Sequence, residues 1–316
     1  MAALSDLPRV VAIGGPTATG KTALSVALAK EFDGEIISAD SMQIYKGLDV
    51  GTAKVTPEEM QGIPHHLIDI LTPDELFSVA EFTARADAAI RDITARGKLP
   101  LIVGGTGLYI SSLLNGVSFA PQKEDLAFRA ALQARIDNGE GQAVYEELCR
   151  LDPDYARTLH PNNTHRVIRA LELYHLTGHT MSEQRAASLP AQKPYRALCI
   201  CLTCADRAEL YRRIDLRVDR MVEAGILPEA EYVWHNRDRF RTAAQAIGYK
   251  EFFPYFEGTG TLEQCTDKLK QASRNYAKRQ LTWFRRQADA VWLEIERPDT
   301  PQRAGELVRQ FLAGED

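Results

Sequence analysis

The segment Gly15-Pro-Thr-Ala-Thr-Gly-Lys-Thr22 has the residue types and spacing of a loop that binds phosphate groups. It follows the apolar run Arg9–Ile13 and precedes the helical pattern Ala23–Phe32. Glycines let backbone N–H groups turn toward phosphate oxygens, and a helix N-terminus adds about half a positive charge. Lys21 adds a mobile cation, and the Thr22 hydroxyl can ligate Mg²⁺. We therefore expect a diphosphate or triphosphate site, here named the phosphate loop, made by Gly15, Pro16, Thr17, Ala18, Thr19, Gly20, Lys21 and Thr22.

Two other polar segments directly follow predicted strands. Asp40–Tyr45 comes after Glu35–Ser38, and Gly104–Tyr109 comes after Leu99–Val103. In open α/β sheets, ligands gather at the carboxyl ends of the strands. Asp40 can hold Mg²⁺, accept a proton or cap a turn. The glycines around Thr106 either admit a ligand or make a tight strand-to-helix turn.

Two helical patterns concentrate positive charge. Arg213, Arg217 and Arg220 recur on one face of a helix that starts near Asp206; they can bind anionic oxygens or pair with Asp215 and Asp219. The segment Lys268–Arg286 contains seven basic residues, no acidic residue and three interleaved aromatic residues. It can contact a nucleic-acid backbone and its bases, or it can be a solvated basic face over buried aromatic residues.

The elements around these residues predict an α/β fold. Further candidate strands are Leu67–Ile70, Ala197–Leu202 and Ala290–Ile295, and Ser78 with Glu81 forms a capping box before a helical pattern that stops at Gly97. Alternating strands and helices indicate a parallel sheet with helices on both faces. Strand patterns are missing between about Pro121 and Pro194, where Leu126–Asn138, Gly141–Arg150 and Thr164–Thr177 have helical patterns. We therefore expect a P-loop NTPase-like core in residues 1–120 and 195–316, with an inserted helical domain in residues 121–194.

Composition narrows the function classes. The 316 residues are 45% hydrophobic and 26% charged, and no apolar run is long enough for a membrane span, which needs about 18 residues. The first residues do not resemble a secretory signal, and five cysteines do not suggest a disulfide framework, so we expect a cytoplasmic protein. Cys199, Cys201 and Cys204 lack a fourth metal ligand nearby and are interpreted as buried thiols. The net charge of −5 does not exclude nucleic acid, because a local basic surface is sufficient.

Five motifs, taken in order, resemble the tRNA dimethylallyltransferase family, also called the IPP transferase family, in its bacterial form. They are the phosphate loop, Asp40–Tyr45 with Gly51-Thr-Ala-Lys54, Gly104–Tyr109, Gln245–Glu251, and Tyr276–Arg285. Thr19 stands where serine is more usual in the family, which is a mild change. The resemblance spans nearly the whole chain and implies a P-loop core with a helical insertion.

The resemblance also implies an activity. Family members transfer a dimethylallyl group from dimethylallyl diphosphate to N6 of adenosine 37, next to the anticodon, in tRNAs that read codons beginning with U. The products are N6-isopentenyladenosine and diphosphate. The implied partners are tRNA and dimethylallyl diphosphate, with Mg²⁺ as cofactor and Thr22 as its ligand. We expect no membrane association and a monomer.

The resemblance assigns roles to individual residues. Asp40 accepts the proton of the amino group, and Thr106 and Arg217 join the phosphate loop in stabilising the leaving diphosphate. The positions that match tRNA contacts are Asp40, Ser41, Met42, Gln43, Phe128, Thr164, His165, Arg166, Val167, Ile168, Gln245, Ala246, Ile247, Gly248, Tyr249 and Lys250.

Three rival functions remain at this stage. An adenylate isopentenyltransferase would act on a free nucleotide, but it needs neither the insertion nor the basic C-terminal helix. The phosphate loop alone would also suit an ATP-dependent kinase or a non-catalytic RNA-binding module. A GTPase is disfavoured because the sequence has no Asn-Lys-x-Asp motif.

Overall fold

The computed structural model describes residues 7–119, 124–287 and 289–314. By its internal contacts the chain divides into two compact units, Met1–Leu114 with Lys193–Asp316, and Asn115–Gln192. The expected domain boundary at residue 121 lies outside the described residues, and the expected boundary at Pro194 lies beside Lys193, where the first unit resumes. None of the helices in the described ranges combines the length and hydropathy that a membrane span requires.

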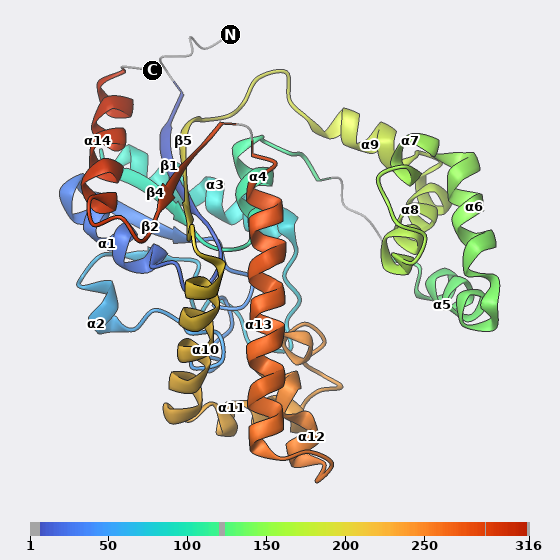
Figure 1. Cartoon of the computed structure of the whole chain (residues 1–316). Helices are drawn as coiled ribbons and strands as arrows, with labels where there is room; N and C mark the ends of the chain where they lie inside the picture. The colour runs from blue at the N-terminus through green and yellow to red at the C-terminus, as the bar shows by residue number, and fades with distance from the viewer. Residues whose placement is uncertain (1–6, 120–123, 288, 315–316) are drawn as a thin grey trace. The chain divides into compact units, whose positions relative to one another are not determined.

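The first unit is built on a parallel sheet with strand order β3-β2-β4-β1-β5-β6 (Figure 1). This arrangement confirms the predicted α/β class. The central strand β1 pairs with both neighbours, so that Ile13 lies opposite Val103 on one side and Ile200 on the other. The strands are β1 (Arg9–Gly14), β2 (Gly34–Ser38), β3 (His65–His66), β4 (Leu99–Val103), β5 (Arg196–Thr203) and β6 (Ala290–Glu294).

Helices cover both faces of the sheet because every strand in its centre is apolar on both sides. On one face, Val11 and Ile13 pack against α1 (Lys21–Glu31) and α14 (Thr300–Ala313). On the other face, Val10 and Ala12 belong to a core shared with α3 (Val79–Ala95) and α4 (Gly107–Leu114). The predicted Ser78–Glu81 capping box begins α3.

The predicted strand Leu67–Ile70 is wrong. The third strand consists of only His65 and His66, and the chain then turns, because Leu67 and Asp69 have left-handed backbone angles of φ 62° and 54°. The N–H groups of Asp69 and Ile70 donate to the carbonyls of Gln43 and Ile44 instead of to a sheet neighbour. Residues 67–71 therefore support the segment that follows Asp40.

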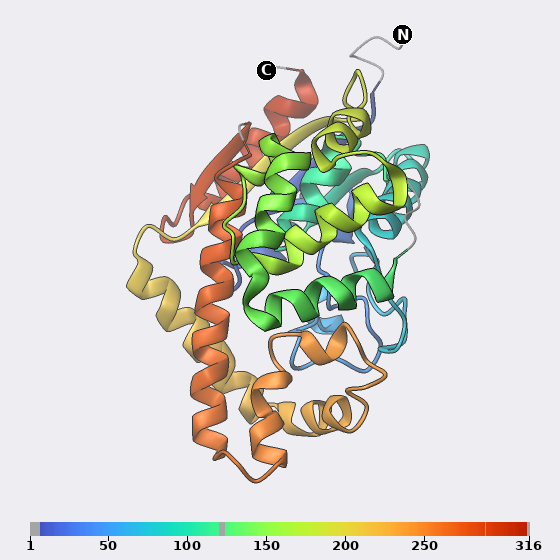
Figure 2. The same ribbon diagram turned by 90° about the vertical axis from the view of Figure 1, so that its right-hand side faces the viewer.

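A third core lies past the carboxyl ends of the strands. It joins apolar residues such as Ile44 and Leu48 to helices that follow β5, where α10 and α13 run side by side in both views (Figures 1 and 2). The remaining helices of this unit are α2 (Pro57–Met60), α10 (Arg207–Glu223), α11 (Ile226–His235), α12 (Phe253–Phe256) and α13 (Leu262–Phe284).

The second unit is helical in its described part (Figure 2). Its core is formed by residues such as Leu132, Leu148 and Leu171, which lie on three different helices. The predicted pattern Leu126–Asn138 is one α-helix followed by the π-helical turn Ile136–Glu140, where Gly139 leaves helical geometry. The helices are α5 (Leu126–Arg135), α6 (Gly141–Leu151), α7 (Pro153–Ala156), α8 (Thr164–Thr177) and α9 (Met181–Ser188).

Candidate active site

The phosphate loop joins β1 to α1 and curls at the carboxyl edge of the sheet. Gly15 has φ 139°, and a Cβ there would lie 2.6 Å from the carbonyl oxygen of Leu202, so this turn requires glycine. The carbonyl of Pro16 accepts hydrogen bonds from Thr19 Oγ1 (2.8 Å) and Lys21 Nζ (2.7 Å). These short-range bonds shape the loop before any ligand binds.

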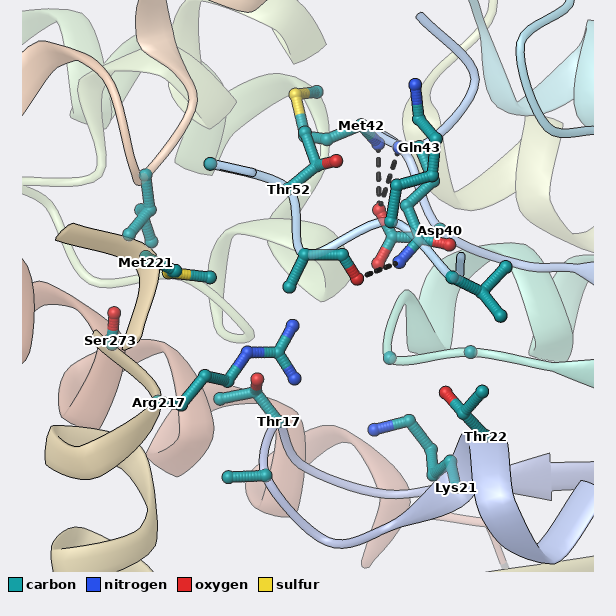
Figure 3. Close-up of a pocket in the computed structure, with 18 of the residues that line it drawn as sticks. Thr17, Lys21, Thr22, Asp40, Met42, Gln43, Thr52, Arg217, Met221 and Ser273 are labelled. Carbon is teal, nitrogen blue, oxygen red and sulfur yellow. Dashed lines mark hydrogen bonds between the residues drawn. The ribbon is translucent and has the colours of Figure 1, made fainter. Parts of the chain in front are cut away.

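Asp40 lies beside the phosphate loop, just past the end of β2 (Figure 3). Its Oδ1 accepts hydrogen bonds from the backbone N–H groups of Met42 (2.8 Å) and Gln43 (3.3 Å). Asp40 therefore does cap a turn, as one reading of the sequence allowed. The described residues donate no hydrogen bond to its Oδ2, so the same carboxylate still has an acceptor atom for a ligand.

Lys21 and Arg217 direct their cationic ends into the same space (Figure 3). Burial and the positive charge of Arg217 lower the pKa of the Lys21 ammonium to about 7, while the Asp40 carboxylate opposes this shift. Burial also lowers the pKa of the Arg217 guanidinium, which nevertheless stays charged at neutral pH. Two neighbouring cations in a shielded place constitute a site that favours a multiply charged anion.

The alternative that the α10 arginines pair with acids on their own helix is wrong for Asp215 and Asp219, but it holds for Arg213, which contacts Glu209 of the same helix at 3.8 Å. Asp215 pairs with Arg274 (2.6 Å) and Asp219 pairs with Lys270 (2.6 Å), and both of these cations lie on α13. The acids therefore tie α10 to α13, and Arg217 is directed into the cavity. The same pairs account for two of the basic residues in the segment Lys268–Arg286.

Gln280, on α13, is a site residue that the sequence reasoning missed. Its side chain is buried; Oε1 accepts from the N–H of Thr17 (2.9 Å), and Nε2 donates to the carbonyl of Gly105 (3.0 Å). It thereby joins the phosphate loop to the loop that carries Thr106. Its position in the Tyr276–Arg285 motif was the only available signal, because the contacts join residues 263 and 175 positions apart.

Thr106 does not line the cavity itself, although Gly104 and Gly105 do. Its Oγ1 is buried without a hydrogen-bond partner in the described part of the chain. Nearby, burial and the negative charge of Asp40 raise the pKa of Tyr276 to about 12, so this phenol is protonated at neutral pH. The Thr106 hydroxyl is thus at the predicted edge of the sheet, but it lies behind the cavity wall, next to Gly105.

Most of the residues predicted for the site line one cavity of about 1160 Å³. Of the predicted residues, it is lined by Thr17, Ala18, Thr19, Gly20, Lys21, Thr22, Asp40, Ser41, Met42, Gln43, Arg217, Gln245, Ala246, Ile247 and Lys250. Two aromatic residues of the segment Lys268–Arg286 have different surroundings. Phe284 is buried in the sheet core, whereas Tyr276 lines the cavity with Arg279. Gly248 and Tyr249 lie behind the wall, and Tyr249 is fully buried.

The other predicted tRNA contacts belong to the second unit. Phe128 stacks on His175 with ring centroids 4.3 Å apart, and Val167 and Ile168 are buried in this unit's core. On the same helix, His165 and Arg166 are exposed. The outward residues of this segment are therefore the ones available to a ligand.

The described residues of the cavity offer few side chains that could ligate a metal ion. Within the described ranges, no group of three or more His, Cys, Asp or Glu side chains could hold a metal ion. Cys199, Cys201 and Cys204 are buried thiols, as predicted. The Thr22 hydroxyl lines the cavity beside Lys21 (Figure 3), which fits an ion that takes most of its ligands from phosphate oxygens and water.

Comparison with known proteins identifies the family. The family model described as IPP transferase matches residues 43–287. The chain is 49% identical over 306 residues to a tRNA dimethylallyltransferase of Geobacillus thermodenitrificans, covering 97% of this chain and 96% of the relative. It is 49% identical over 305 residues to the Bacillus subtilis protein of the same name, with 96% of each chain covered.

The chain belongs to the IPP transferase family. Solved structures of family members agree with this assignment. The full-length tRNA isopentenylpyrophosphate transferase from Bacillus halodurans superposes with a TM-score of 0.73 at 44% identity, covering 97% of both chains. A eukaryotic dimethylallyltransferase, described as acting on tRNA, superposes with a TM-score of 0.82 at 32% identity, covering 97% of this chain and 80% of that one.

Proposed function

We propose that this IPP transferase family member is a tRNA dimethylallyltransferase, which transfers a dimethylallyl group from dimethylallyl diphosphate to N6 of adenosine 37. The substrates are tRNAs that read codons beginning with U, and we place the reaction in the cytoplasm. The observation that carries the assignment is the single cavity in which Asp40 faces the two cations Lys21 and Arg217. It offers an acceptor for an amino proton and a cationic place for diphosphate. We also propose that the enzyme is a monomer.

Asp40 acts on the nucleophile. The lone pair of an adenine amino group is delocalised into the ring, so N6 attacks poorly unless it is aligned. The Oδ2 atom of Asp40 accepts a hydrogen bond from N6, and its partner Oδ1 is fixed by the N–H groups of Met42 and Gln43. As the new N–C bond forms, the acidified N6 proton passes to this carboxylate. Fixing the carboxylate contributes alignment more than basicity.

The other side of the cavity acts on the leaving group. The allylic carbon–oxygen bond breaks, and its electron pair goes to the diphosphate. Backbone N–H groups of the phosphate loop, Lys21 and Arg217 stabilise the charge that develops there. Thr106 lies one residue behind the cavity wall, and its buried Oγ1, which has no hydrogen-bond partner among the described residues, would reach the same anion through a shift of the Gly104–Gly107 loop. Thr22 would hold Mg²⁺ against the diphosphate oxygens, and the ion would add positive charge at the leaving group.

The tRNA contacts the part of the cavity wall that does not bind the diphosphate. Adenosine 37 has to leave the stack of the anticodon loop, which costs a few kcal/mol. Ser41, Met42 and Gln43 lie on one part of the wall. Another part is formed by Gln245, Ala246, Ile247 and Lys250. In the second unit, we propose contacts from Phe128 and from Thr164, His165 and Arg166, with Val167 and Ile168 supporting their helix.

Incubation with labelled dimethylallyl diphosphate and either unmodified tRNA or AMP tests this function. The expected result is label in tRNA at adenosine 37 and none in AMP. Label in AMP alone would show an enzyme of free nucleotides. ATP turnover with neither acceptor labelled would show a kinase and would contradict the proposal.

A further inference from the structure

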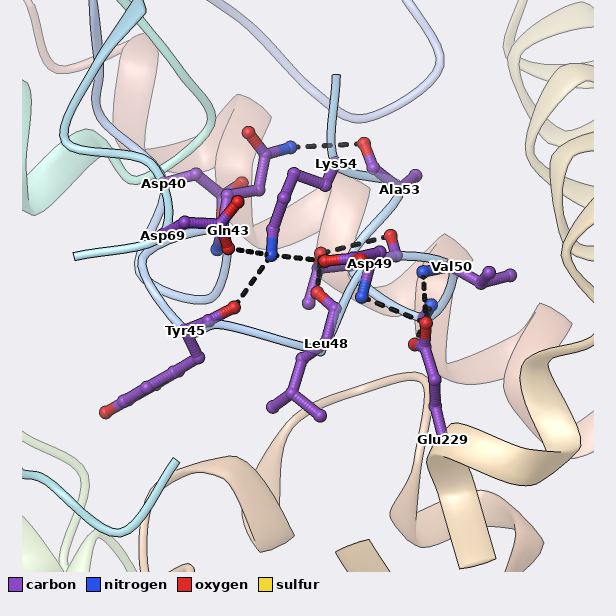
Figure 4. Close-up of polar contacts among 12 residues, drawn as sticks. Asp40, Gln43, Tyr45, Leu48, Asp49, Val50, Ala53, Lys54, Asp69 and Glu229 are labelled. Atoms are coloured by element: carbon purple, nitrogen blue, oxygen red, sulfur yellow. Dashed lines mark hydrogen bonds and ion pairs between the residues drawn. The ribbon is translucent and has the colours of Figure 1, made fainter. Parts of the chain in front are cut away.

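Glu229, on α11, holds the segment from Asp40 to Lys54, here named the Asp40 loop (Figure 4). Its Oε1 accepts from the backbone N–H groups of Asp49 (3.0 Å) and Val50 (2.8 Å), and its Oε2 accepts from the N–H of Gly51 (3.0 Å). Three successive N–H groups that converge on one point form an anion-binding nest. In this protein a side chain of the same chain, about 180 residues away, occupies the nest.

The same carboxylate also contacts a residue that lies behind another part of the cavity wall. Glu229 Oε2 also accepts from the phenol of Tyr249 at 3.0 Å. Tyr249 is fully buried and belongs to the segment Gln245–Lys250. A Cβ on Gly51 would lie 2.4 Å from the Tyr249 ring, so the backbone of the Asp40 loop lies directly against this phenol. Glu229 thus fastens together two segments to which we have assigned tRNA contacts.

A continuous path leads from Glu229 to the proposed proton acceptor. Two residues past Gly51, the carbonyl of Ala53 accepts from Gln43 Nε2 at 3.2 Å. The backbone N–H of Gln43 in turn donates to Asp40 Oδ1. Moving the Asp49–Ala53 stretch would therefore move both the Gln43 side chain and the turn that fixes the Asp40 carboxylate.

Lys54 anchors the end of this stretch independently. Its ammonium is buried and contacts the Tyr45 carbonyl (2.7 Å), Asp49 (2.5 Å) and Asp69 (2.5 Å), as Figure 4 shows. With the loop fixed at Lys54, Glu229 determines how the part between Val50 and Ala53 lies against Tyr249. The carboxylate shows no contact with the cavity itself, since Glu229 is absent from its lining.

We propose that Glu229 is a positioning residue of the transfer reaction, which sets the placement of Gln43 and Asp40 toward the tRNA adenosine through the Asp49–Gly51 backbone. This inference rests on the proposed function, because it concerns the tRNA side of the same site. The diphosphate side is held by other contacts: the Pro16 carbonyl shapes the phosphate loop, and the Asp215–Arg274 pair ties α10, which carries Arg217, to α13.

The test compares Glu229→Gln with Glu231→Gln in the full chain. Glu231 lies on the same helix, is exposed and contacts His235 at 4.0 Å, so it is a matched control. We expect Glu229→Gln to lower kcat/KM for tRNA between about tenfold and a hundredfold, because small misplacements at a reacting centre have effects of that size. The KM of Glu229→Gln for dimethylallyl diphosphate should match that of the wild type. All kinetic constants of Glu231→Gln should match those of the wild type.

A double-mutant cycle separates positioning from a general loss of structure. If Glu229 acts through Gln43, then Glu229→Gln adds little to the loss caused by Gln43→Ala. Tyr249→Phe, which deletes only the phenol bond, keeps the test possible if Glu229→Gln folds poorly. It should lower kcat/KM for tRNA a few fold and leave the KM for dimethylallyl diphosphate unchanged. Additive losses in the cycle, or equal losses for both substrates, would overturn the positioning role.

The two proposals fail differently. If the wild-type enzyme places no label in tRNA, the proposed function is wrong. If the wild type labels tRNA and both Glu229→Gln and Tyr249→Phe are as active as the wild type, only the role of Glu229 is wrong.

Discussion

The phosphate loop and the Asp40 loop follow β1 and β2, two parallel strands on either side of β4, and face one cavity, but different kinds of contacts hold them. The Pro16 carbonyl binds partners only three and five residues further along the chain. The Asp40 loop depends on Asp69, 15 residues away, and on Glu229, up to 180 residues away. Local contacts shape most of the general anion site, to which Gln280 adds a distant one through the Thr17 N–H, whereas a site that must align a base with one carboxylate is assembled mainly from distant elements.

The largest expected effect is on the chemical step at the Asp40 loop. Asp40→Asn should lower the single-turnover rate of transfer by about 10²–10⁴-fold, because the amide cannot accept the N6 proton. Its carbonyl oxygen can still accept from Met42 N–H, so tRNA affinity should stay near the wild-type value. The exposed Asp74→Asn serves as the control. A normal single-turnover rate for Asp40→Asn would refute the assigned role.

Arg217 tests the diphosphate side of the comparison. Arg217→Gln should slow transfer by about 10²–10³-fold, since one preorganised charge at the leaving group is lost. Arg207, exposed at the start of the same helix, provides the matched control Arg207→Gln. Rapid-quench kinetics over a range of dimethylallyl diphosphate concentrations is the measurement. Unchanged kinetics would mean that the guanidinium does not meet the diphosphate.

A substitution of Gln280 tests whether contacts between nearby residues are sufficient to shape the phosphate loop. Gln280→Met keeps the length of the side chain but removes the bonds to Thr17 N–H and the Gly105 carbonyl. We expect kcat/KM for dimethylallyl diphosphate to fall by about tenfold, because a buried backbone N–H loses its acceptor. Gln271→Met, on the exposed side of the same helix, should be neutral. A neutral Gln280→Met would mean that local contacts alone shape the phosphate loop.

The smallest effect concerns the protonation of Lys21. Since the pKa of Lys21 is lowered to about 7, the free enzyme holds this lysine mostly neutral at pH 8 and mostly charged at pH 6. When an anion binds to the charged form of Lys21, the complex should take up about one proton at pH 8 and almost none at pH 6. The affinity for the anion should fall by at most ~tenfold per pH unit above 7.

Calorimetric titration of inorganic diphosphate in buffers of different ionisation enthalpy measures this proton uptake. Lys21→Arg, which stays charged throughout the range, is the control and should show less uptake at pH 8. Equal uptake by the two proteins would show that the proton goes to the diphosphate and not to Lys21.

The sequence predicted the elements whose signals are local. The phosphate loop, the Ser78–Glu81 cap and the strand Leu99–Val103 each depend on neighbouring residues, and the structure has them. Leu67–Ile70 has a strand-like composition, but the carbonyls of the Asp40 loop bind its N–H groups, which the pattern cannot reveal. Spacing allowed Asp215 to pair with an arginine of its own helix; only the packing of α13 supplies Arg274. Gln280 and Glu229 were missed because their partners lie far along the chain.

The most direct test of the central claim is a crystal structure of the enzyme with an unmodified tRNA anticodon stem-loop and an unreactive thio analogue of dimethylallyl diphosphate. We predict that adenosine 37 lies in the cavity with N6 within hydrogen-bond distance of Asp40. The diphosphate should contact Lys21 and Arg217. A structure in which the Asp40 carboxylate is turned away from N6, or in which the diphosphate binds outside the phosphate loop, would contradict the account.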